Sequence, residues 1–268
     1  MSVNYHFHSC CSFDADHPLT EMCHAAEQWG IKHLCLTDHC DLINDRGQVD
    51  DSFSWEKVNR ELEAARRMYG SRLDIRKGVE LGQAILRPEA AEKILSEPGI
   101  DFVLGSMHNC REGIDYYWIE FESLRHCEAM LEDYLLCLLE LSRTDYFDSL
   151  AHLTYPQRYM RGKHGFPVRF EPYYDLIREI LKTLVERGKA LELNTSGYQN
   201  NGGEPLPNRE ILMMYRELGG DLITLGSDAH VPEDMNQGLE QGIALLRDCG
   251  FQYLTLYKER KPQQILLP

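Results

Sequence analysis

The sequence predicts an α/β fold in which parallel strands close into a barrel surrounded by helices. Short apolar strands alternate with helical segments along all 268 residues. This alternation is typical of parallel βαβ units, and seven or eight such units favour a closed barrel over an open sheet. The chain shows no linker, low-complexity segment or charge block, and its length suits one barrel. We therefore expect a single domain over residues 1–268.

In the first half of the chain, capping and turn residues bound each element. Thr20 and Ser54 are expected to act as helix N-caps, Gly30 is expected to end a helix, and Pro88 suits a first helical turn. The elements expected here are, in order, a strand at 3–7, a helix at 19–30, a strand at 33–37, a helix at 54–70, a strand at 73–79, a short helix from 88 and a strand at 101–106.

The second half continues the same alternation. The amphipathic stretch 124–142 is the clearest helix in the chain, and Gly188 is expected to end a later one. The remaining elements are strands at 146–150, 190–194, 221–225 and 252–256, and helices at 173–187, 208–218 and 235–248. Three longer loops, 40–53, 109–119 and 155–168, follow strands, where a barrel builds its active site.

Composition narrows the class of protein. Hydrophobic residues make up 43% and charged residues 26%, as in an ordinary globular protein. The formal net charge of −15 argues against a large nucleic-acid-binding surface, and bound cations could offset part of it. No apolar run reaches the roughly 18 residues of a membrane helix. With no signal peptide, an odd number of cysteines (nine) and no C-x-x-C pair, we expect a cytoplasmic protein with reduced thiols.

Side chains that can bind metals follow nearly every expected strand. They are His6, His8, Asp14 and His17 after the first strand, Asp38 and His39 after the second, then Glu80, His108, His152, Asp228 and His230. A lone histidine at a strand end is more often structural, and His24, His33 and His126 are interpreted in that way. The whole set, however, falls where barrel enzymes place their chemistry, so we expect metal binding.

The spacing of these residues is consistent with that chemistry. His6 and His8 lie two apart on a strand, so both rings face the same side. Asp228 and His230 repeat this spacing, and Glu80 is a candidate to bridge two ions. Imidazole together with carboxylate suits Zn²⁺, Fe²⁺ or Mn²⁺.

These motifs resemble those of the PHP (polymerase and histidinol phosphatase) family, and within it most closely those of the monofunctional histidinol-phosphate phosphatases. The similarity runs from His6 to His230 and rests on the segments His6-x-His8, Ser12-x-Asp14, Thr37-Asp38-His39, Gly78-Val79-Glu80, Ser106-Met107-His108, Ala151-His152 and Ser227-Asp228-Ala229-His230. The resemblance implies a distorted, TIM-like (β/α)7 barrel with its active site at the C-terminal ends of the strands.

The resemblance also implies a trinuclear metal centre. One ion would use His6, His8, Glu80 and Asp228, a second would use Glu80, His108 and His152, and a third would use Asp14, His39 and His230. Many relatives carry histidine where this chain has Asp14, and a carboxylate can still ligate at that position. The expected cofactors are three divalent ions, Zn, Fe or Mn.

The activity implied by the resemblance is hydrolysis of L-histidinol phosphate to L-histidinol and inorganic phosphate, a step in histidine biosynthesis. We expect a hydroxide bridging the two ions that share Glu80 to attack phosphorus. His17 is the candidate for phosphate contact or proton donation. Arg158 and Arg161, which follow the expected strand 146–150, are expected to bind substrate because guanidinium groups suit phosphate oxygens. Asn194 and Ser196 are expected to contact substrate because they end the expected strand 190–194, which carries no metal ligand.

Two other classes of function stay open at this point. Another hydrolase of the same barrel type could act on nucleotides, oligonucleotide ends or an amide, although amidohydrolase barrels commonly use a carboxylated lysine that this chain lacks at the expected place. Alternatively, the chain could be a non-catalytic metal-binding regulatory protein. A substrate panel with measurement of inorganic phosphate release tests the first alternative, and metal content measured together with phosphatase turnover tests the second.

Overall fold

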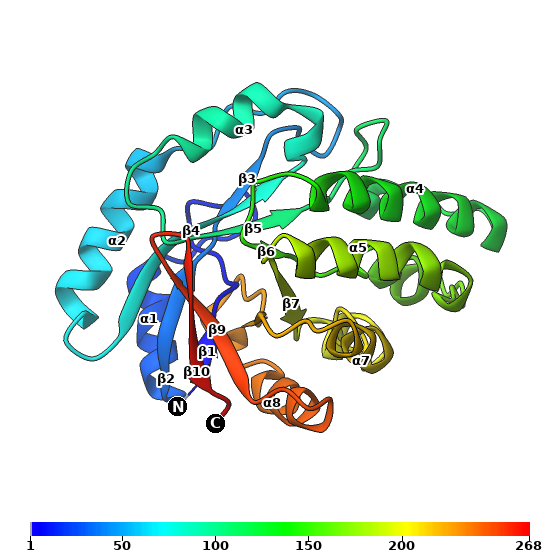
Figure 1. Cartoon of the computed structure of the whole chain (residues 1–268). Coiled ribbons are helices and arrows are strands. Elements are labelled where there is room, and N and C mark those ends of the chain that lie inside the picture. Colours follow the sequence, from blue (N-terminus) through cyan, green and yellow to red (C-terminus); the bar gives the residue numbers. More distant parts are fainter. Residues whose placement is uncertain (1) are drawn as a thin grey trace.

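The computed structural model describes residues 2–268 and confirms the expected barrel of parallel strands with helices outside (Figure 1). Neighbouring strands pair in the order β1-β2-β4-β5-β6-β7-β8, and all of these pairs are parallel. Their bounds are β1 Ser2–Asn4, β2 Ile31–Leu36, β4 Asp74–Gly82, β5 Phe102–Ser106, β6 Ser149–Leu150, β7 Ala190–Asn194 and β8 Ile223–Gly226.

The first and last strands of this order close the barrel through the segment that follows β1. The Tyr5 amide donates to the Leu225 carbonyl (2.9 Å), and Phe7 forms a parallel bridge with Ala229. The Asp228 amide then donates to the His6 carbonyl (2.8 Å). These bonds bring two of the motifs recognised in the sequence side by side.

Helices follow the strands and cover the outside of the sheet. They are α1 Leu19–Gln28, α2 Trp55–Tyr69, α3 Pro88–Leu95, α4 Leu124–Ser142, α5 Tyr174–Glu186, the short α6 Gly197–Asn200, α7 Arg209–Glu217 and α8 Leu239–Asp248. Ser54 caps α2 as expected by accepting from the Lys57 amide. Across residues 2–268, none of the helices combines the length and apolar character needed to cross a membrane.

The structure corrects several details. Pro18, not Thr20, precedes α1 as its N-cap residue, and it offers no capping side chain. A short strand, β3 (His39–Asp41), was not expected and pairs with β4. The last expected strand, β9 (Tyr253–Lys258), does not join the barrel. It forms an antiparallel hairpin with β10 (Lys261–Leu266), a strand that was not expected, and Figure 1 shows this hairpin crossing the barrel strands.

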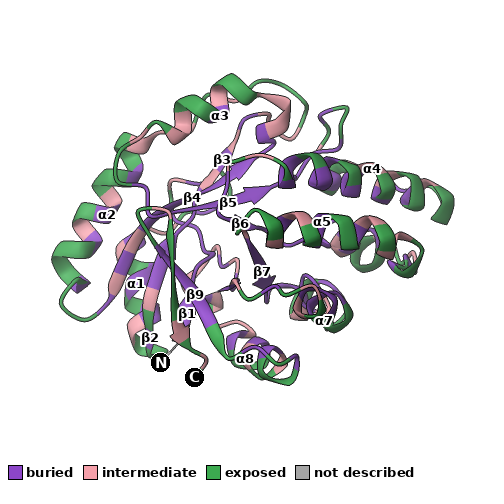
Figure 2. Ribbon diagram, in the orientation of Figure 1, coloured by how far each residue is buried: buried purple, intermediate pink, exposed green. Residues whose placement is uncertain are grey.

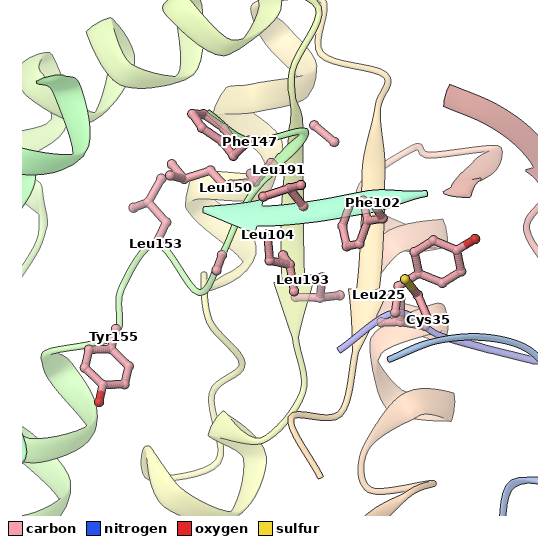
Figure 3. Close-up of a cluster of buried hydrophobic side chains, with 14 of the residues drawn as sticks. Cys35, Phe102, Leu104, Phe147, Leu150, Leu153, Tyr155, Leu191, Leu193 and Leu225 are labelled. Atoms are coloured by element: carbon pink, nitrogen blue, oxygen red, sulfur yellow. The ribbon is translucent and has the colours of Figure 1, made fainter. Parts of the chain in front are cut away.

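Burial explains why the strands read as continuous apolar runs. Every residue of β5, β7 and β8 is buried, as expected for parallel strands covered on both faces, whereas the helices expose their outer sides (Figure 2). In Figure 3, Leu104 of β5, Leu191 and Leu193 of β7 and Leu225 of β8 gather in one apolar cluster. This packing fixes the strand ends that carry the polar side chains.

Candidate metal centre

The polar residues at the carboxyl ends of the barrel strands converge on one cluster. Glu80, in β4, is fully buried and lies at its centre. The other members follow β1, β2, β5, β6 and β8, and each was expected from the sequence; they are His6, His8, Asp14, His39, His108, His152, Asp228 and His230. Their nitrogen and carboxylate oxygen atoms form three neighbouring groups.

The first ligand set consists of His6, His8, Asp228 and the Oε2 atom of Glu80. The Oε2 atom of Glu80 lies 3.3 Å from His6 Nε2 and 3.8 Å from His8 Nε2. Asp228 Oδ1 lies 3.4 Å and 3.2 Å from the same two nitrogens. Two imidazoles and two carboxylates therefore direct one atom each toward a common point.

The second ligand set consists of His108, His152 and the other oxygen of Glu80, Oε1. This oxygen lies 3.1 Å from His108 Nε2 and 2.9 Å from His152 Nε2, and the two nitrogens are 3.4 Å apart. The single carboxylate of Glu80 thus offers one oxygen to each of two neighbouring sets.

The third ligand set consists of Asp14, His39 and His230. Asp14 Oδ2 lies 3.2 Å from His230 Nε2 and 3.6 Å from His39 Nε2. The opposite ring nitrogen of His39, Nδ1, lies 3.0 Å from Glu80 Oε2, so this set adjoins the first. It is the most open of the three, since the Asp14 side chain is 38% exposed.

Two members of the cluster adopt backbone conformations that are unusual for residues with side chains. His152 has φ of +21° and Asp228 has φ of +58°. Non-glycine residues in this region are strained and persist where the surrounding structure holds them. The backbone after β6 and β8 is therefore bent to direct these two side chains inward.

Outer hydrogen bonds engage Nδ1 on four of the rings, so that Nε2 of each ring faces the carboxylates of the cluster. His6 Nδ1 lies 2.7 Å from Glu192 Oε1, and His108 Nδ1 lies 3.0 Å from Asp41 Oδ1. His8 Nδ1 is paired with the Ser12 hydroxyl, which donates to Asp38; His230 Nδ1 is paired with the Asp228 carbonyl. A ring that donates through Nδ1 presents the lone pair of Nε2, the arrangement usual for metal-binding histidines.

The electrostatics of the cluster are dominated by buried carboxylates. Burial would lower the pKa of His6, but the nearby Glu192, Glu80 and Asp228 carboxylates raise it well above its ordinary value. Burial would raise the pKa of Glu80, but the surrounding rings hold it well below its ordinary value. His8 differs: burial and the facing His230 and His39 rings lower its pKa to about 3. Such a concentration of buried negative charge is unfavourable unless positive charge lies close to it.

The residues present fit a divalent cation centre. The atoms available to bind a metal are imidazole nitrogens and carboxylate oxygens, which suit Zn²⁺, Fe²⁺ and Mn²⁺. Among residues 2–268, four triads place three such atoms within 4.8 Å of one another; they are His6–His8–Asp228, His6–Glu80–His152, His8–His39–His230 and His39–Asp41–His108. These triads consist of histidine, aspartate and glutamate side chains and include no cysteine thiol.

Three of the residues expected to bind substrate meet beside Asp228. The Arg158 guanidinium donates to Ser196 Oγ (2.6 Å) and to Asp228 Oδ2 (3.1 Å), and the Asn194 amide donates to the same carboxylate oxygen (3.3 Å). Burial lowers the pKa of Arg158, but Asp228 outweighs this effect and raises it. Arg158 follows β6 in a π-helical turn, Arg158–Lys163, within a segment expected to be a loop.

The other two expected residues have partners at the surface. His17 Nδ1 pairs with Glu21 (2.8 Å), and its side chain is 37% exposed. Arg161 pairs with Glu204 (2.9 Å), and its side chain is 42% exposed. The structure does not bring either side chain into contact with the three ligand sets, so their roles in phosphate binding or proton donation stay predictions.

A pocket of about 420 Å³ opens beside the cluster. Its walls combine metal-centre residues, three further carboxylates and several aromatic rings, and the full lining is Phe13, Asp14, His39, Asp41, Asp45, His108, Asp115, Tyr117, Trp118, Tyr155 and Tyr159. The loops 42–50 and 109–118 form one wall, held together by a bridge between Arg46 and Ile114. Both loops were expected at the active-site end, but the sequence did not identify the side chains that they contribute to the lining, which are Asp45, Asp115, Tyr117 and Trp118.

Comparison with known proteins agrees with this geometry. A family model described as "PHP domain" matches residues 4–196. A probable histidinol-phosphatase of Thermotoga maritima is 30% identical over 254 residues, covering 95% of each chain. A solved structure of histidinol phosphate phosphatase from Lactococcus lactis, complexed with zinc, L-histidinol and phosphate, is 25% identical, covers 98% of each chain and superposes with a TM-score of 0.83. The histidinol-phosphatase of that organism is 26% identical over 261 residues.

Proposed function

The chain belongs to the PHP domain family, and we propose that it hydrolyses L-histidinol phosphate to L-histidinol and inorganic phosphate in a metal-dependent reaction. The observation that carries this proposal is the convergence of the three ligand sets beside a pocket large enough for an organic phosphate. The Lactococcus lactis relative, whose match covers 98% of this chain, was solved with zinc, L-histidinol and phosphate.

We propose that the three ligand sets each hold one divalent ion, Zn, Fe or Mn. Glu80 would bridge the first two, since its two oxygens face different sets. When bound, such ions neutralise the oxygens of a phosphate monoester and acidify a water molecule toward a pKa of about 7. The chain's own part is to hold the imidazoles in one tautomer and to keep the bridging carboxylate ionised, as its lowered pKa indicates.

Arg158 is the side chain best placed to receive the phosphate group. Its guanidinium is fixed by Ser196 and Asp228 at the edge of the first ligand set, so it is oriented before substrate arrives. Charge-assisted bonds from a guanidinium to phosphate oxygens are among the strongest that a protein makes. Asn194 and Ser196 hold this arrangement, and His17 and Arg161 remain candidates for contact with substrate or leaving group.

The pocket beside the cluster suits an organic group that carries positive charge. Asp45 and Asp115 line it together with the rings of Phe13, Tyr117 and Trp118. Within residues 2–268, the Asp45 carboxylate has no hydrogen-bond or ion-pair partner. An ammonium group and an imidazole ring would find carboxylates and aromatic faces there. The anionic phosphates of an oligonucleotide would be repelled, in keeping with the net charge of −15.

The proposed function also includes the domain organisation, the cellular compartment and the partners of the protein. We propose that residues 1–268 form one PHP domain, that the enzyme acts in the cytoplasm on a small phosphorylated substrate, and that it requires neither a nucleic acid nor a membrane partner. Its nine cysteines are free thiols, which suits a reducing compartment.

Substrate kinetics with defined metals test the proposed function. Phosphate release is measured with L-histidinol phosphate, a nucleoside monophosphate and an aryl phosphate, after chelation and after adding back zinc, manganese or iron. We expect kcat/KM for L-histidinol phosphate to exceed the others by at least about 100-fold, a difference of about 2.7 kcal/mol. Equal turnover of all three esters, or full activity after chelation, would contradict the proposal.

A further inference from the structure

The strand β7 contributes no residue to the three ligand sets, yet it carries a glutamate in its buried middle. Side chains alternate along the strand: Leu193 faces α8, where it lies against Gly242, and Figure 3 shows Leu191 and Leu193 in the apolar cluster. Glu192 faces the opposite way and is 1% exposed. A carboxylate this deeply buried has to be compensated by specific partners.

The two oxygens of Glu192 contact members of different ligand sets, and Oε2 also accepts a longer bond from the Asn194 side-chain amide (3.4 Å). Oε1 lies 2.7 Å from Nδ1 of His6, a member of the first set. Oε2 accepts from the backbone N–H of His152, a member of the second set, at 2.8 Å. Glu80 contacts the Nε2 atoms of the same two histidines from the inner side.

We infer that Glu192 is a positioning residue that fixes His6 and His152 relative to each other and thereby sets the spacing of the two sets that share Glu80. This inference rests on the proposed metal centre. The His6 bond places the proton on Nδ1 and directs the Nε2 lone pair at the first set. The His152 bond anchors a residue whose φ of +21° needs support from its surroundings.

The side chains of His6 and Glu192 pack closely against Gly226 of β8. A Cβ atom at Gly226 of β8 would lie 2.2 Å from His6 Cβ and 2.9 Å from Glu192 Oε1. Only glycine at this site therefore allows His6 and Glu192 to approach each other between β1 and β7. The close approach is a second feature, independent of the hydrogen bonds, that shows how tightly the pair is held.

Glu192 contacts members of two ligand sets, whereas Asp41, another carboxylate that lies outside the ligand sets, contacts a member of one. Asp41 supports one ring: within residues 2–268, its carboxylate hydrogen-bonds to His108 Nδ1 and to no other member of the ligand sets. Loss of Asp41 should therefore affect the second set alone. Loss of Glu192 should disturb the first set, the second set or both.

The substitution Glu192→Gln tests whether both contacts are needed, because a side-chain amide has one acceptor oxygen where a carboxylate has two. If its oxygen accepts from the His152 N–H, its NH₂ group faces His6 Nδ1, which must then accept; the proton moves to Nε2, and that atom can no longer ligate. If the amide turns over, the His152 N–H faces a donor. Either orientation weakens one ligand set.

The experiment compares zinc binding by the wild type, Glu192→Gln and the matched control Asp148→Asn. Asp148 is also a buried carboxylate that accepts from a backbone N–H, that of Val103 (2.9 Å), but it pairs with Arg260 away from the cluster. Zinc affinity is measured by competition with a chromogenic chelator, and thermal unfolding of the metal-free proteins is followed in parallel.

For Glu192→Gln we expect at least one zinc ion to bind about 10–100-fold more weakly, with turnover recovering as zinc is raised to saturation. Asp148→Asn should unfold at a lower temperature and bind zinc within about twofold of the wild type. Wild-type zinc affinity in Glu192→Gln would overturn the inference. If that variant does not fold, Glu192→Asp, which keeps the charge but is shorter, should show the same weakening, and unchanged affinity would overturn the inference equally. Absence of zinc binding by the wild type would instead refute the proposed function.

Discussion

Replacing Glu80 with glutamine tests whether one side chain joins two metal sites. The substitution keeps the shape of the side chain and removes one ligand oxygen and the negative charge. Since Oε2 faces the first ligand set and Oε1 faces the second, the single oxygen of glutamine can serve only one of them. The first set would retain three other ligands, whereas the second would retain two, His108 and His152.

The expected size of the effect follows from this count. Zinc sites in proteins normally hold three or four protein ligands, so the second set should lose its ion and the first should keep it. Removing one neutral hydrogen-bond donor from an oxyanion site lowers kcat by about 10²–10³, and the charge of a divalent ion exceeds that of one donor. We therefore expect kcat to fall by at least about 10³, or about 4 kcal/mol.

Metal analysis and kinetics on the same sample provide the assay. Zinc per chain is measured by mass spectrometry after gel filtration, and phosphate release from L-histidinol phosphate gives kcat. Glu97→Gln is the matched control, because Glu97 binds Lys77 (2.6 Å) on the outside of the barrel and its loss should leave both quantities unchanged. A Glu80→Gln protein with full zinc content and kcat within tenfold of the wild type would refute the bridging role.

Three further predictions follow from the same geometry. Arg158→Lys should lower kcat/KM by about 10–100-fold, since a lysine cannot reproduce both guanidinium bonds, while zinc content stays at the wild-type level; steady-state kinetics and metal analysis check this. Thorough chelation should abolish phosphate release, and added zinc should restore it, as followed with a colorimetric phosphate assay. In the metal-free protein, the carboxylates around His6, His39 and His108 outweigh burial and raise the pKa of each ring. Protonation of these rings thus stabilises the fold below their unfolded pKa of about 6.5, and that stability is lost as pH rises through the raised values. The melting temperature without metal should therefore fall between pH 6 and pH 8.5, and a rise over this range would contradict the assignment.

Much of the fold was predictable because local patterns determine it. The helix α4 and the strand β7 have the bounds expected from apolar spacing, since both are long or fully buried enough for periodicity to be clear. The position of strand β6 was predicted, but its length was not: it ends at Leu150 as expected and begins at Ser149, three residues later than the expected 146.

The terminal hairpin shows where local patterns fail. The apolar stretch of β9 looks like one more barrel strand, but β8 closes on the segment after β1 through Tyr5 and Leu225, and this leaves no edge for another strand. The partner of β9 is the polar strand β10, whose residues are mostly exposed. A pairing between such unlike strands is set by the closure of the barrel, which no short segment of sequence reveals.

The candidate site divides in the same way. The candidate metal-binding residues could be predicted from their positions because parallel strands bring their carboxyl ends to one rim, whereas their division into three sets was implied by the resemblance to the PHP family. The outer residues could not, since their roles depend on which ring each happens to meet: Asp41 meets His108, and Glu192 meets His6. A glutamate in the middle of the apolar segment 190–194 was nevertheless a usable signal, because an unpaired charge is rarely buried.

The arrangement of charge links the stability of the barrel to its chemistry. Glu80, Glu192 and Asp38 are at most 1% exposed, and burying several carboxylates together is unfavourable unless positive charge is close. Protonated histidines supply it below the raised pKa values of His6, His39 and His108, but a protonated ring cannot ligate a metal. Divalent ions supply it at neutral pH and leave the rings deprotonated. The same buried carboxylates that are expected to make the stability of the metal-free barrel depend on pH are therefore expected to favour cation binding.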